Sequence, residues 1–361
     1  MPPFVAAHTG REPEHLRLAP ALCCLCGVED ADPIAVGTDF EYRTSPDEFL
    51  AVRCRRCRLV YLNPRPADDE AERIYPDDYH AFQFRPAEFG LVYRIRRRLE
   101  ARRLLRWCRG LPTDARILDV GCGDGFHLGL LKEFGKPGWE LEGVDADMRA
   151  VAPARASGLT IHLGSVEEID LPASAYHLIL MVMTVEHLAD PLETIRSVAR
   201  LLVPGGRLVV VTDNARSPDF ALFGGRHWGG FHFPRHTYLF DKGTLAELGA
   251  AAGLAVERIA TAVSPVNWVY SLRNWLDDWG APRWVVNRLS LKATLPLGFF
   301  TLLDMPLAAV GQGAILHGTF RKPATGRTST EPMIEKSLRE TPSFLYSLLH
   351  GKYPQPMTGR G

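Results

Sequence analysis

Four cysteines near the N-terminus have the residue type and spacing of metal ligands. They form two pairs, Cys23-x-x-Cys26 and Cys54-x-x-Cys57. Two such pairs can deliver four thiolates to one tetrahedral Zn²⁺ ion, and a closed shell of four thiolates has no position for a reacting water. We therefore predict a zinc ribbon whose ion is structural rather than catalytic. The alternative is four ordinary reduced thiols.

A glycine-rich segment has the pattern of a nucleoside-binding loop. The apolar run Ile117–Val120 is followed by Gly121-Cys122-Gly123-Asp124-Gly125. Glycine allows the chain to turn sharply and lets a ligand approach the backbone closely. A dinucleotide fingerprint would read G-x-G-x-x-G, but here Phe126 stands directly after the third glycine. The spacing favours a nucleoside without a pyrophosphate, and the alternative is a tight turn without a ligand.

Residues at the ends of two further predicted strands can complete this site. Asp145 follows the second strand, where its carboxylate can accept hydrogen bonds from both ribose hydroxyls. Ser165 and Val166 follow the third strand, where they can flank an adenine ring.

Two loops contain side chains that could take a proton from a second substrate. Glu186 and His187 follow the fourth strand, and residues 226–240 are rich in histidine and aromatic residues. Both loops belong at the carboxyl ends of parallel strands, where ligands bind in such sheets. We expect His236 to act as the base or to orient the acceptor, with His187 and Glu186 as the next candidates. Alternatively, each is a buried, hydrogen-bonded residue that orders its loop.

The elements that must position these residues follow an α/β alternation. From residue 115 onward, short β-branched runs are separated by helical patterns, which predicts a parallel sheet with helices on both faces. We predict strands at 116–120, 141–145, 159–164, 177–183, 207–212 and 254–262, with a last strand within 315–321. One helix should span 191–203 and stop at Pro204-Gly205-Gly206, and a second should run from an N-cap at Asp241 to Gly253.

Two segments lie outside this alternation. Residues 93–109 predict an amphipathic helix in which arginines alternate with Ile95, Leu99, Leu104 and Leu105. Residues 265–310 form a long apolar insert before the last strand. This insert is either a helical lid over the acceptor or a peripheral membrane contact. In the second case the interfacial aromatics would be Trp268, Trp275, Trp279 and Trp284.

Composition and charge limit the remaining possibilities. The chain has 361 residues, 46% of them hydrophobic, and a formal net charge of zero, so no global field draws it to nucleic acid. The N-terminus lacks a basic segment followed by an apolar core, so we expect a cytoplasmic protein with reduced thiols. The expected organisation is an N-terminal tail (1–20), a zinc ribbon (21–62), a linker and basic helix (63–110), a main domain (111–323) and a C-terminal tail (324–361) with a weak helix at 333–349.

Taken together, the motifs resemble those of class I S-adenosylmethionine-dependent methyltransferases over roughly residues 95–262. They are Leu118 to Gly125, Asp145, Val185-Glu186-His187-Leu188-x-x-Pro191 and Leu202-x-Pro204-Gly205-Gly206. The resemblance implies that Asp119 and Gly121 contact the methionine part of the cofactor, Asp145 the ribose, and Val166 with Met183 the adenine. The predicted cofactor site is Asp119, Gly121, Cys122, Gly123, Asp145, Ala146, Ser165, Val166 and Met183. His177 departs from the family, because many relatives carry an acid at that position.

The resemblance implies a Rossmann-like methyltransferase that acts on a small-molecule, glycan or lipid-linked acceptor, at a hydroxyl group. The ribbon, the Tyr75-Pro-x-x-Tyr79 link and the main domain together are similar to bacterial methyltransferases of sugar, polysaccharide and natural-product pathways. Sugar C-methyltransferases with such a ribbon carry a further large domain, which this chain is too short to contain. The alternatives are a nicotinamide-dependent sugar oxidoreductase, a methyltransferase of RNA or protein, and a binding protein that has lost catalysis.

Overall fold

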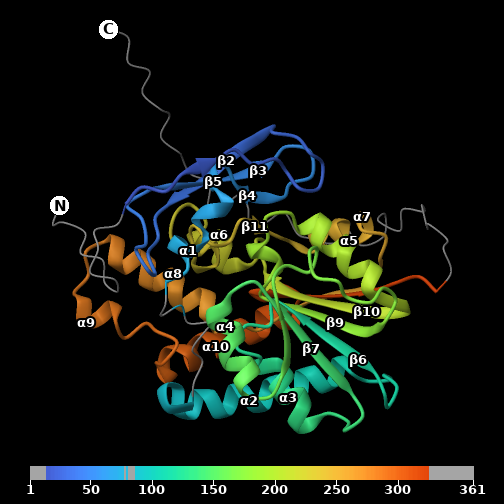
Figure 1. Ribbon diagram of the computed structural model, residues 1–361. Coiled ribbons are helices and arrows are strands. Elements are labelled where there is room, and N and C mark those ends of the chain that lie inside the picture. Colours follow the sequence, from blue (N-terminus) through green and yellow to red (C-terminus); the bar gives the residue numbers. More distant parts are fainter. Residues whose placement is uncertain (1–13, 77–78, 80–85, 325–361) are drawn as a thin grey trace. The chain divides into compact units, whose positions relative to one another are not determined.

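A seven-stranded sheet forms the centre of the main domain (Figure 1). The computed structural model describes residues 14–76, 79 and 86–324. The strand order is β12-β13-β10-β9-β6-β7-β8. The strands are β6 (Arg116–Val120), β7 (Glu140–Asp145), β8 (Thr160–Leu163), β9 (Tyr176–Val182), β10 (Leu202–Asp213), β12 (Ala255–Ala262) and β13 (Ile315–Arg321). All seven strands lie at the predicted places.

The expectation of a parallel sheet is wrong for β13. The five strands from β8 to β10 pair in parallel, but β13 is antiparallel to both β10 and β12. Ala262 at the end of β12 pairs with Ile315 at the start of β13. The chain therefore re-enters the sheet beside the point at which it left, and it can only run back in the opposite direction.

Helices cover both faces of this sheet, as predicted. Leu104 of α2 (Pro86–Trp107) and Leu130 of α3 (Phe126–Phe134) pack with Ile117 on one face, with α4 (Met148–Ala156) beside them. Ile195 of α5 (Pro191–Leu201) and Leu245 of α7 (Lys242–Ala251) pack on the other face. Burial of these apolar side chains from both sides explains why the central strands are almost continuously hydrophobic.

Two details of the predicted helices are wrong. Helix α5 ends at Leu201, because Leu202 already pairs with Tyr176, and the turn residues 204–206 fall within β10 where the register shifts. In α2 the side chains of Ile95 and Leu99 are 50% and 58% exposed. The buried side of that helix is instead formed by Ala101 and Leu104. The helix Lys242–Ala251 begins at its predicted N-cap, Asp241, whose side chain accepts from the Thr244 amide.

The N-terminal ribbon (residues 21–62) forms a second sheet, to which the main domain contributes one strand. Strands β2 (Ala31–Gly37), β3 (Phe49–Cys54) and β4 (Val60–Leu62) are antiparallel neighbours. The short strand β11 (Tyr238–Leu239) adds to β4 and completes the four-stranded sheet (Figure 1). The ribbon is followed by β5 (Arg65–Pro66), which pairs with β1 (Leu18–Ala19), and by η1 (Asp68–Glu70) and α1 (Ala71–Ile74).

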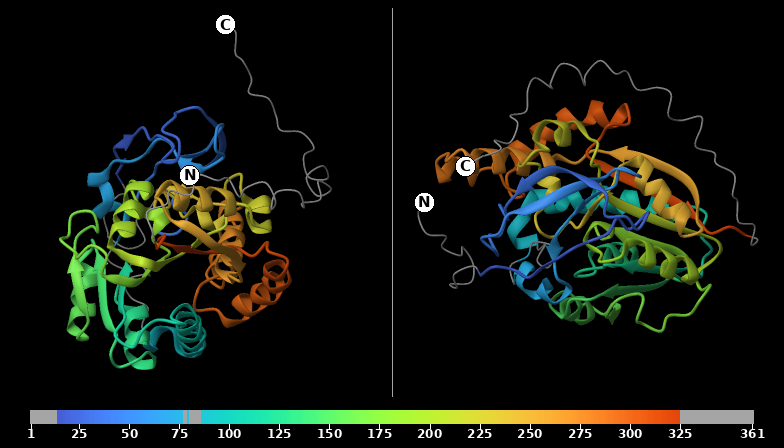
Figure 2. Two further views of the ribbon diagram at one scale, coloured as in Figure 1. Left: turned by 90° about the vertical axis from the view of Figure 1, so that its right-hand side faces the viewer. Right: turned by 90° about the horizontal axis from the view of Figure 1, so that it is seen from above.

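The apolar insert is helical, as predicted. It consists of α8 (Pro265–Asp278), α9 (Arg283–Val286) and α10 (Thr294–Ala309), drawn in orange in Figure 2. Trp268 is not an interfacial aromatic, because it is buried against Phe300. The buried carboxylate of Asp304 accepts from the amide of Ser264 and from the Trp268 indole, which fastens α10 to the start of α8. Within the described residues, no helix combines the length and apolarity needed to cross a bilayer. The weak helix predicted at 333–349 lies outside the described residues.

Candidate active site

The glycine loop connects β6 to α3 and lies against the ends of two neighbouring strands. The amide of Gly121 donates to Val144 O at 2.8 Å, and the amide of Gly123 donates to the Asp145 carboxylate at 2.8 Å. Gly121 has φ +72°, and a Cβ there would overlap the Thr184 side chain. Only glycine fits this position, because the backbone is left-handed and Thr184 fills the adjacent space.

Asp145, the residue that we predict to bind the ribose, is held in place by hydrogen bonds at the edge of this loop. The second carboxylate oxygen of Asp145 accepts from the Asp147 amide at 2.9 Å, and burial raises the pKa of this carboxyl. The carbonyl oxygen of Asp145 accepts from Gly164 N, so Ser165 and Val166 follow directly beside it. A carboxylate oxygen has two lone pairs, so Asp145 can still accept from ribose hydroxyls.

Asp119, near the end of β6, is the residue beside the loop whose surroundings indicate a ligand. Its side chain is buried, and neither carboxylate oxygen has a hydrogen-bond partner among the described residues. The nearest cationic candidate is His127, whose Nδ1 lies 3.7 Å away. A buried carboxylate without partners is costly, so a ligand that brings positive charge and donors fits here.

The remaining predicted cofactor residues differ in what they present to the loop. Met183 follows β9 in a left-handed conformation, with φ 55°, and is about one-third exposed. Ala146 is exposed beside Asp145. The Cys122 side chain packs away from the loop, among Leu128 and Val151, so Cys122 can offer only backbone to a ligand.

The predicted acid–base residues come together next to the glycine loop. Glu186 and His187 lie in η3 (Val185–His187), directly after Thr184, and His236 approaches from the histidine-rich loop. The donor atoms of these three side chains lie within 4.8 Å of one another. His236 Nδ1 is 2.8 Å from Gly230 O and 3.4 Å from an Asp213 carboxylate oxygen. Since a carbonyl can only accept, Nδ1 carries the proton and donates it.

Burial controls the charges in this cluster. Burial raises the pKa of Glu186, and the Asp213 carboxylate raises it further, while burial also raises the pKa of Asp213. Burial and the imidazoles of His187 and His232 lower the pKa of His236 well below its usual value. At neutral pH His236 is therefore an uncharged imidazole. The neighbouring carboxyls of Glu186 and Asp213 remain protonated to a higher pH than exposed carboxyls do.

The ribbon contributes residues that sequence analysis missed. Asp39 accepts from both terminal nitrogens of Arg235, at 3.1 and 2.8 Å, and both side chains are 0% exposed. Glu41 Oε2 lies 2.7 Å from Nδ1 of His232. The link contributes as well, since the hydroxyl of Tyr75 is 2.9 Å from His187 Nδ1. No local pattern marks these partners, because they are far apart in the sequence.

A small pocket lies beside His232, next to this cluster, with room for about one water molecule. Its wall comes from the ribbon, from the histidine-rich loop and from α8. The lining includes Phe40, Glu41, Trp228, His232, Tyr270 and Asn274. His227 does not join the cluster, because its Nε2 pairs with Asp278 at 2.8 Å.

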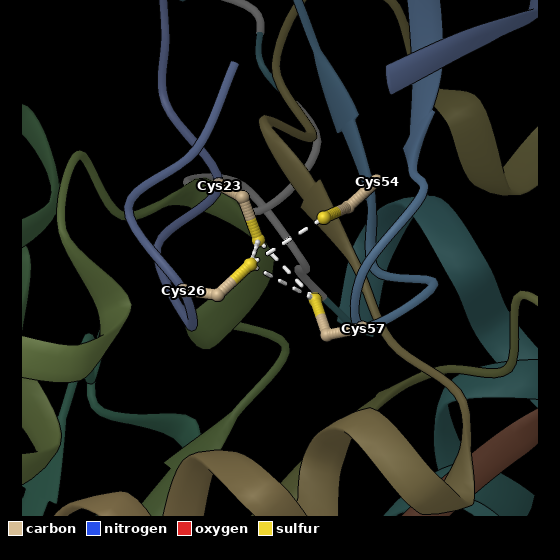
Figure 3. Close-up of side chains that lie close together, drawn as sticks. All are labelled: Cys23, Cys26, Cys54 and Cys57. Carbon is tan, nitrogen blue, oxygen red and sulfur yellow. Dashed lines mark hydrogen bonds between the residues drawn. The ribbon is translucent and has the colours of Figure 1, made fainter. Parts of the chain in front are cut away.

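The four predicted metal ligands converge in the ribbon. Figure 3 shows the four sulfur atoms pointing toward one another, and the distances from Cys26 Sγ to the other three are 3.5, 3.4 and 3.8 Å. Four thiolates around Zn²⁺, each at about 2.3 Å, stand roughly 3.8 Å apart. Each pair is followed by a left-handed residue, Gly27 or Arg58, which closes a tight knuckle. The donor set therefore fits a tetrahedral thiolate-bound ion.

Comparison with known proteins identifies the family of the main domain. Residues 92–259 match a family model described as a methyltransferase domain. A ubiquinone biosynthesis O-methyltransferase of Cereibacter sphaeroides is 34% identical over 169 residues, which cover 44% of this chain and 67% of that protein. The protein of the same name from Aromatoleum aromaticum is 30% identical over 176 residues, covering 45% and 74%. The segment matched by the family model contains the glycine loop, Glu186, His187 and His236, and it excludes the ribbon and the insert.

Proposed function

Because the chain belongs to the class I S-adenosylmethionine-dependent methyltransferases, we propose that it methylates a hydroxyl group of a small molecule. The names of its relatives describe O-methyltransferases. The observation that carries the proposal is the neutral, buried imidazole of His236 beside the cofactor loop. An uncharged imidazole can accept a proton or orient a hydroxyl, whereas a cationic one cannot act as a base.

We propose that the described loop holds the cofactor through three kinds of contact. The unpartnered Asp119 carboxylate receives the positively charged methionine part, and Asp145 receives the ribose hydroxyls. Val166 and Met183 border the adenine. When bound, S-adenosylmethionine supplies an electrophilic methyl group on a sulfonium. The cluster of Glu186, His187 and His236 would then orient the acceptor oxygen for in-line attack.

For the ribbon we propose a structural Zn²⁺ ion held by the four thiolates. The ion would fix the two knuckles on which β3 and β4 depend, and β4 in turn pairs with β11 of the main domain. The zinc site therefore stabilises the loop that leads into β11 without touching the reacting atoms.

A second candidate for the acceptor is a lipid-linked molecule that the protein reaches by peripheral membrane contact. The exposed surface of α10 favours this acceptor over a glycan. On α10 the side chains of Leu295, Phe299 and Leu302 are 86%, 64% and 71% exposed. Residues 283–303 include basic side chains and no acid. Exposed apolar side chains that are flanked by basic residues favour binding to the surface of an anionic bilayer. Helix α8 meanwhile forms part of the pocket wall, which is the role expected of a lid.

Binding and product assays test the main proposal. Calorimetry should detect S-adenosylmethionine and its demethylated product, and Asp145→Ala should lose most of that affinity. Catechol, a free hexose and a prenylated catechol in detergent serve as acceptors, and mass spectrometry should find one added methyl group on at least one of them. Cofactor binding without any product would support a binding protein, and tight NADH binding would support the oxidoreductase.

Flotation tests the membrane proposal. The protein should float with vesicles that contain phosphatidylglycerol at low salt, and a Phe299→Ser, Leu302→Ser double variant should remain at the bottom. Leu222→Ser, at an exposed position outside the insert, is the matched control. If the double variant floats as the wild type does, α10 is not the contact.

A further inference from the structure

His232, a neighbour of the cluster of Glu186, His187 and His236, lines the pocket with a carboxylate beside it. His232 and Glu41 both line the pocket, whereas His187 and His236 do not. Glu41 Oε2 is 2.7 Å from His232 Nδ1. We propose that His232, oriented by Glu41 of the ribbon, is the base that receives the proton of the acceptor hydroxyl. This inference rests on the proposed function and leaves the orienting role to His236.

The carboxylate explains why His232 suits this role. Glu41 accepts from Nδ1, so Nε2 is the basic nitrogen of the ring. A carboxylate at this position also stabilises the imidazolium that forms when the ring takes up a proton. His236 instead donates from Nδ1 to the carbonyl of Gly230 at 2.8 Å, with an Asp213 oxygen farther away at 3.4 Å, and burial lowers its pKa well below its usual value. The carboxylate partner at 2.7 Å therefore marks His232 as the imidazole positioned to hold a proton.

The backbone at His232 is held in an unusual conformation. The residue has φ 38° and ψ 44°, in the left-handed region that a β-carbon disfavours. Hydrogen bonds on both sides fix it there, from His232 N to Gly229 O and from Arg235 N to His232 O. Strain of this kind persists where surrounding contacts impose it, and it is common in functional residues. Here it places Nδ1 of the imidazole against Glu41, while Nε2 is buried within the protein.

The ribbon supplies Glu41 on a firmly anchored loop. Asp39, two residues earlier, accepts from both Arg235 nitrogens and from the amides of Tyr42 and Thr44. Arg235 lies between His232 and His236 in the sequence, and its guanidinium stacks over the Tyr42 ring at 4.5 Å. One buried ion pair thus fixes the spacing between the carboxylate and the histidine.

Other groups also face His232 and affect its proton affinity. The rings of His236, Tyr79, Tyr42 and His187 lie 5.0, 5.9, 6.1 and 6.4 Å from its ring. Tyr270 also lines the pocket and donates to Glu41, and burial raises its pKa well above the usual value, so it is neutral. The carboxylate of Glu41 favours the protonated imidazole, and the Arg235 guanidinium, which stacks on Tyr42 and is paired with Asp39, opposes it.

The reaction balances with these groups. The acceptor oxygen forms a bond to the methyl carbon while the bond between that carbon and sulfur breaks. The electron pair of the broken bond stays on sulfur. The hydroxyl proton moves to His232 Nε2, and the resulting imidazolium is paired with Glu41. Release of this proton to water restores the enzyme.

Histidine NMR tests the inference without any acceptor. In ¹⁵N-labelled protein, the pKa of His232 should lie above that of His236 by about one unit or more, and Glu41→Gln should lower it. Glu41→Asp should restore part of the shift. Titration of His232 below His236, or an unchanged His232 in Glu41→Gln, overturns the dyad.

Turnover with whichever acceptor the product assay identifies is the second measurement. His232→Asn keeps a residue that tolerates the left-handed backbone, and kcat should fall by about 10²–10⁴-fold with unchanged cofactor affinity. Glu41→Gln should move the acidic limb of the pH profile to lower pH. His227→Asn, on the same loop but outside the cluster, is the control and should retain wild-type kcat. Wild-type kcat in His232→Asn overturns the assignment but not the methyltransferase function, and absence of product from the wild type counts against that function alone.

Discussion

Removal of the Asp39 carboxylate should destabilise the protein far more than the loss of any exposed ion pair. Both partners of the Asp39–Arg235 pair are 0% exposed, and the guanidinium donates to both carboxylate oxygens. When one partner of a buried pair is removed, the remaining charge stays buried without compensation, which costs about 3–5 kcal/mol. A whole domain is stable by only about 5–15 kcal/mol. Asp39→Asn should therefore remove a large part of the free energy of unfolding.

Urea unfolding followed by circular dichroism measures this loss. The matched control is Asp32→Asn in the same ribbon, because Asp32 pairs with Arg55 and both side chains are more than half exposed. Solvation already satisfies such charges, so the control should keep the wild-type midpoint. An Asp39→Leu, Arg235→Met double variant should recover part of the stability, because it leaves no buried charge. A wild-type midpoint in Asp39→Asn would refute the reasoning. An equal loss of stability in Asp39→Asn and Asp32→Asn would refute it as well.

The pH dependence of this pair has a defined sign. Burial opposes ionisation of Asp39, but the Arg235 guanidinium outweighs it and lowers the pKa of the carboxyl below its usual value. The unfolded chain therefore takes up this proton at a higher pH than the folded chain does. The stabilisation is present above the unfolded value of about 3.9 and is lost as the pH falls through the folded pKa. The difference between wild type and Asp39→Asn should thus shrink only in strong acid.

Three further predictions concern the cofactor loop, the ribbon and the histidine cluster. Gly121→Ala should abolish S-adenosylmethionine binding in calorimetry, because the new methyl group overlaps Thr184 on a left-handed backbone; retained affinity would contradict the described loop. Elemental analysis should find one zinc ion per chain, and a Cys54→Ser, Cys57→Ser double variant should lose it and lower kcat through β4 and β11; full metal content would exclude the site. Because the folded pKa of His236 is lowered, its contribution to stability is complete above about pH 6.5 and is lost as the pH falls. His236→Gln should therefore flatten the acid side of a melting-temperature profile, and an unchanged slope would mean that His236 is not buried in its neutral form.

Local patterns in the sequence were sufficient for most of the fold and for the cofactor loop. The apolar run Leu208–Val211 is buried on both faces of the sheet, and its composition of leucine and valine reflects that burial. The paired cysteines and the glycine loop were also predictable, because their geometry is set by residues a few positions apart. The antiparallel β13 was not predictable in this way, since strand direction depends on where the insert returns the chain.

The acceptor side of the site depends on contacts between distant residues. The sequence alone indicated that Glu186, His187 and His236 belong at the carboxyl ends of the strands, because each follows a recognisable strand or loop. It gave no sign that Glu41 meets His232 or that Asp39 meets Arg235, because the ribbon reads as a separate module. These pairs form because β11, a strand of two residues, adds to β4 and brings the two loops together. So short a strand has no periodic pattern, and only the tertiary structure could show which carboxylate stands behind which histidine.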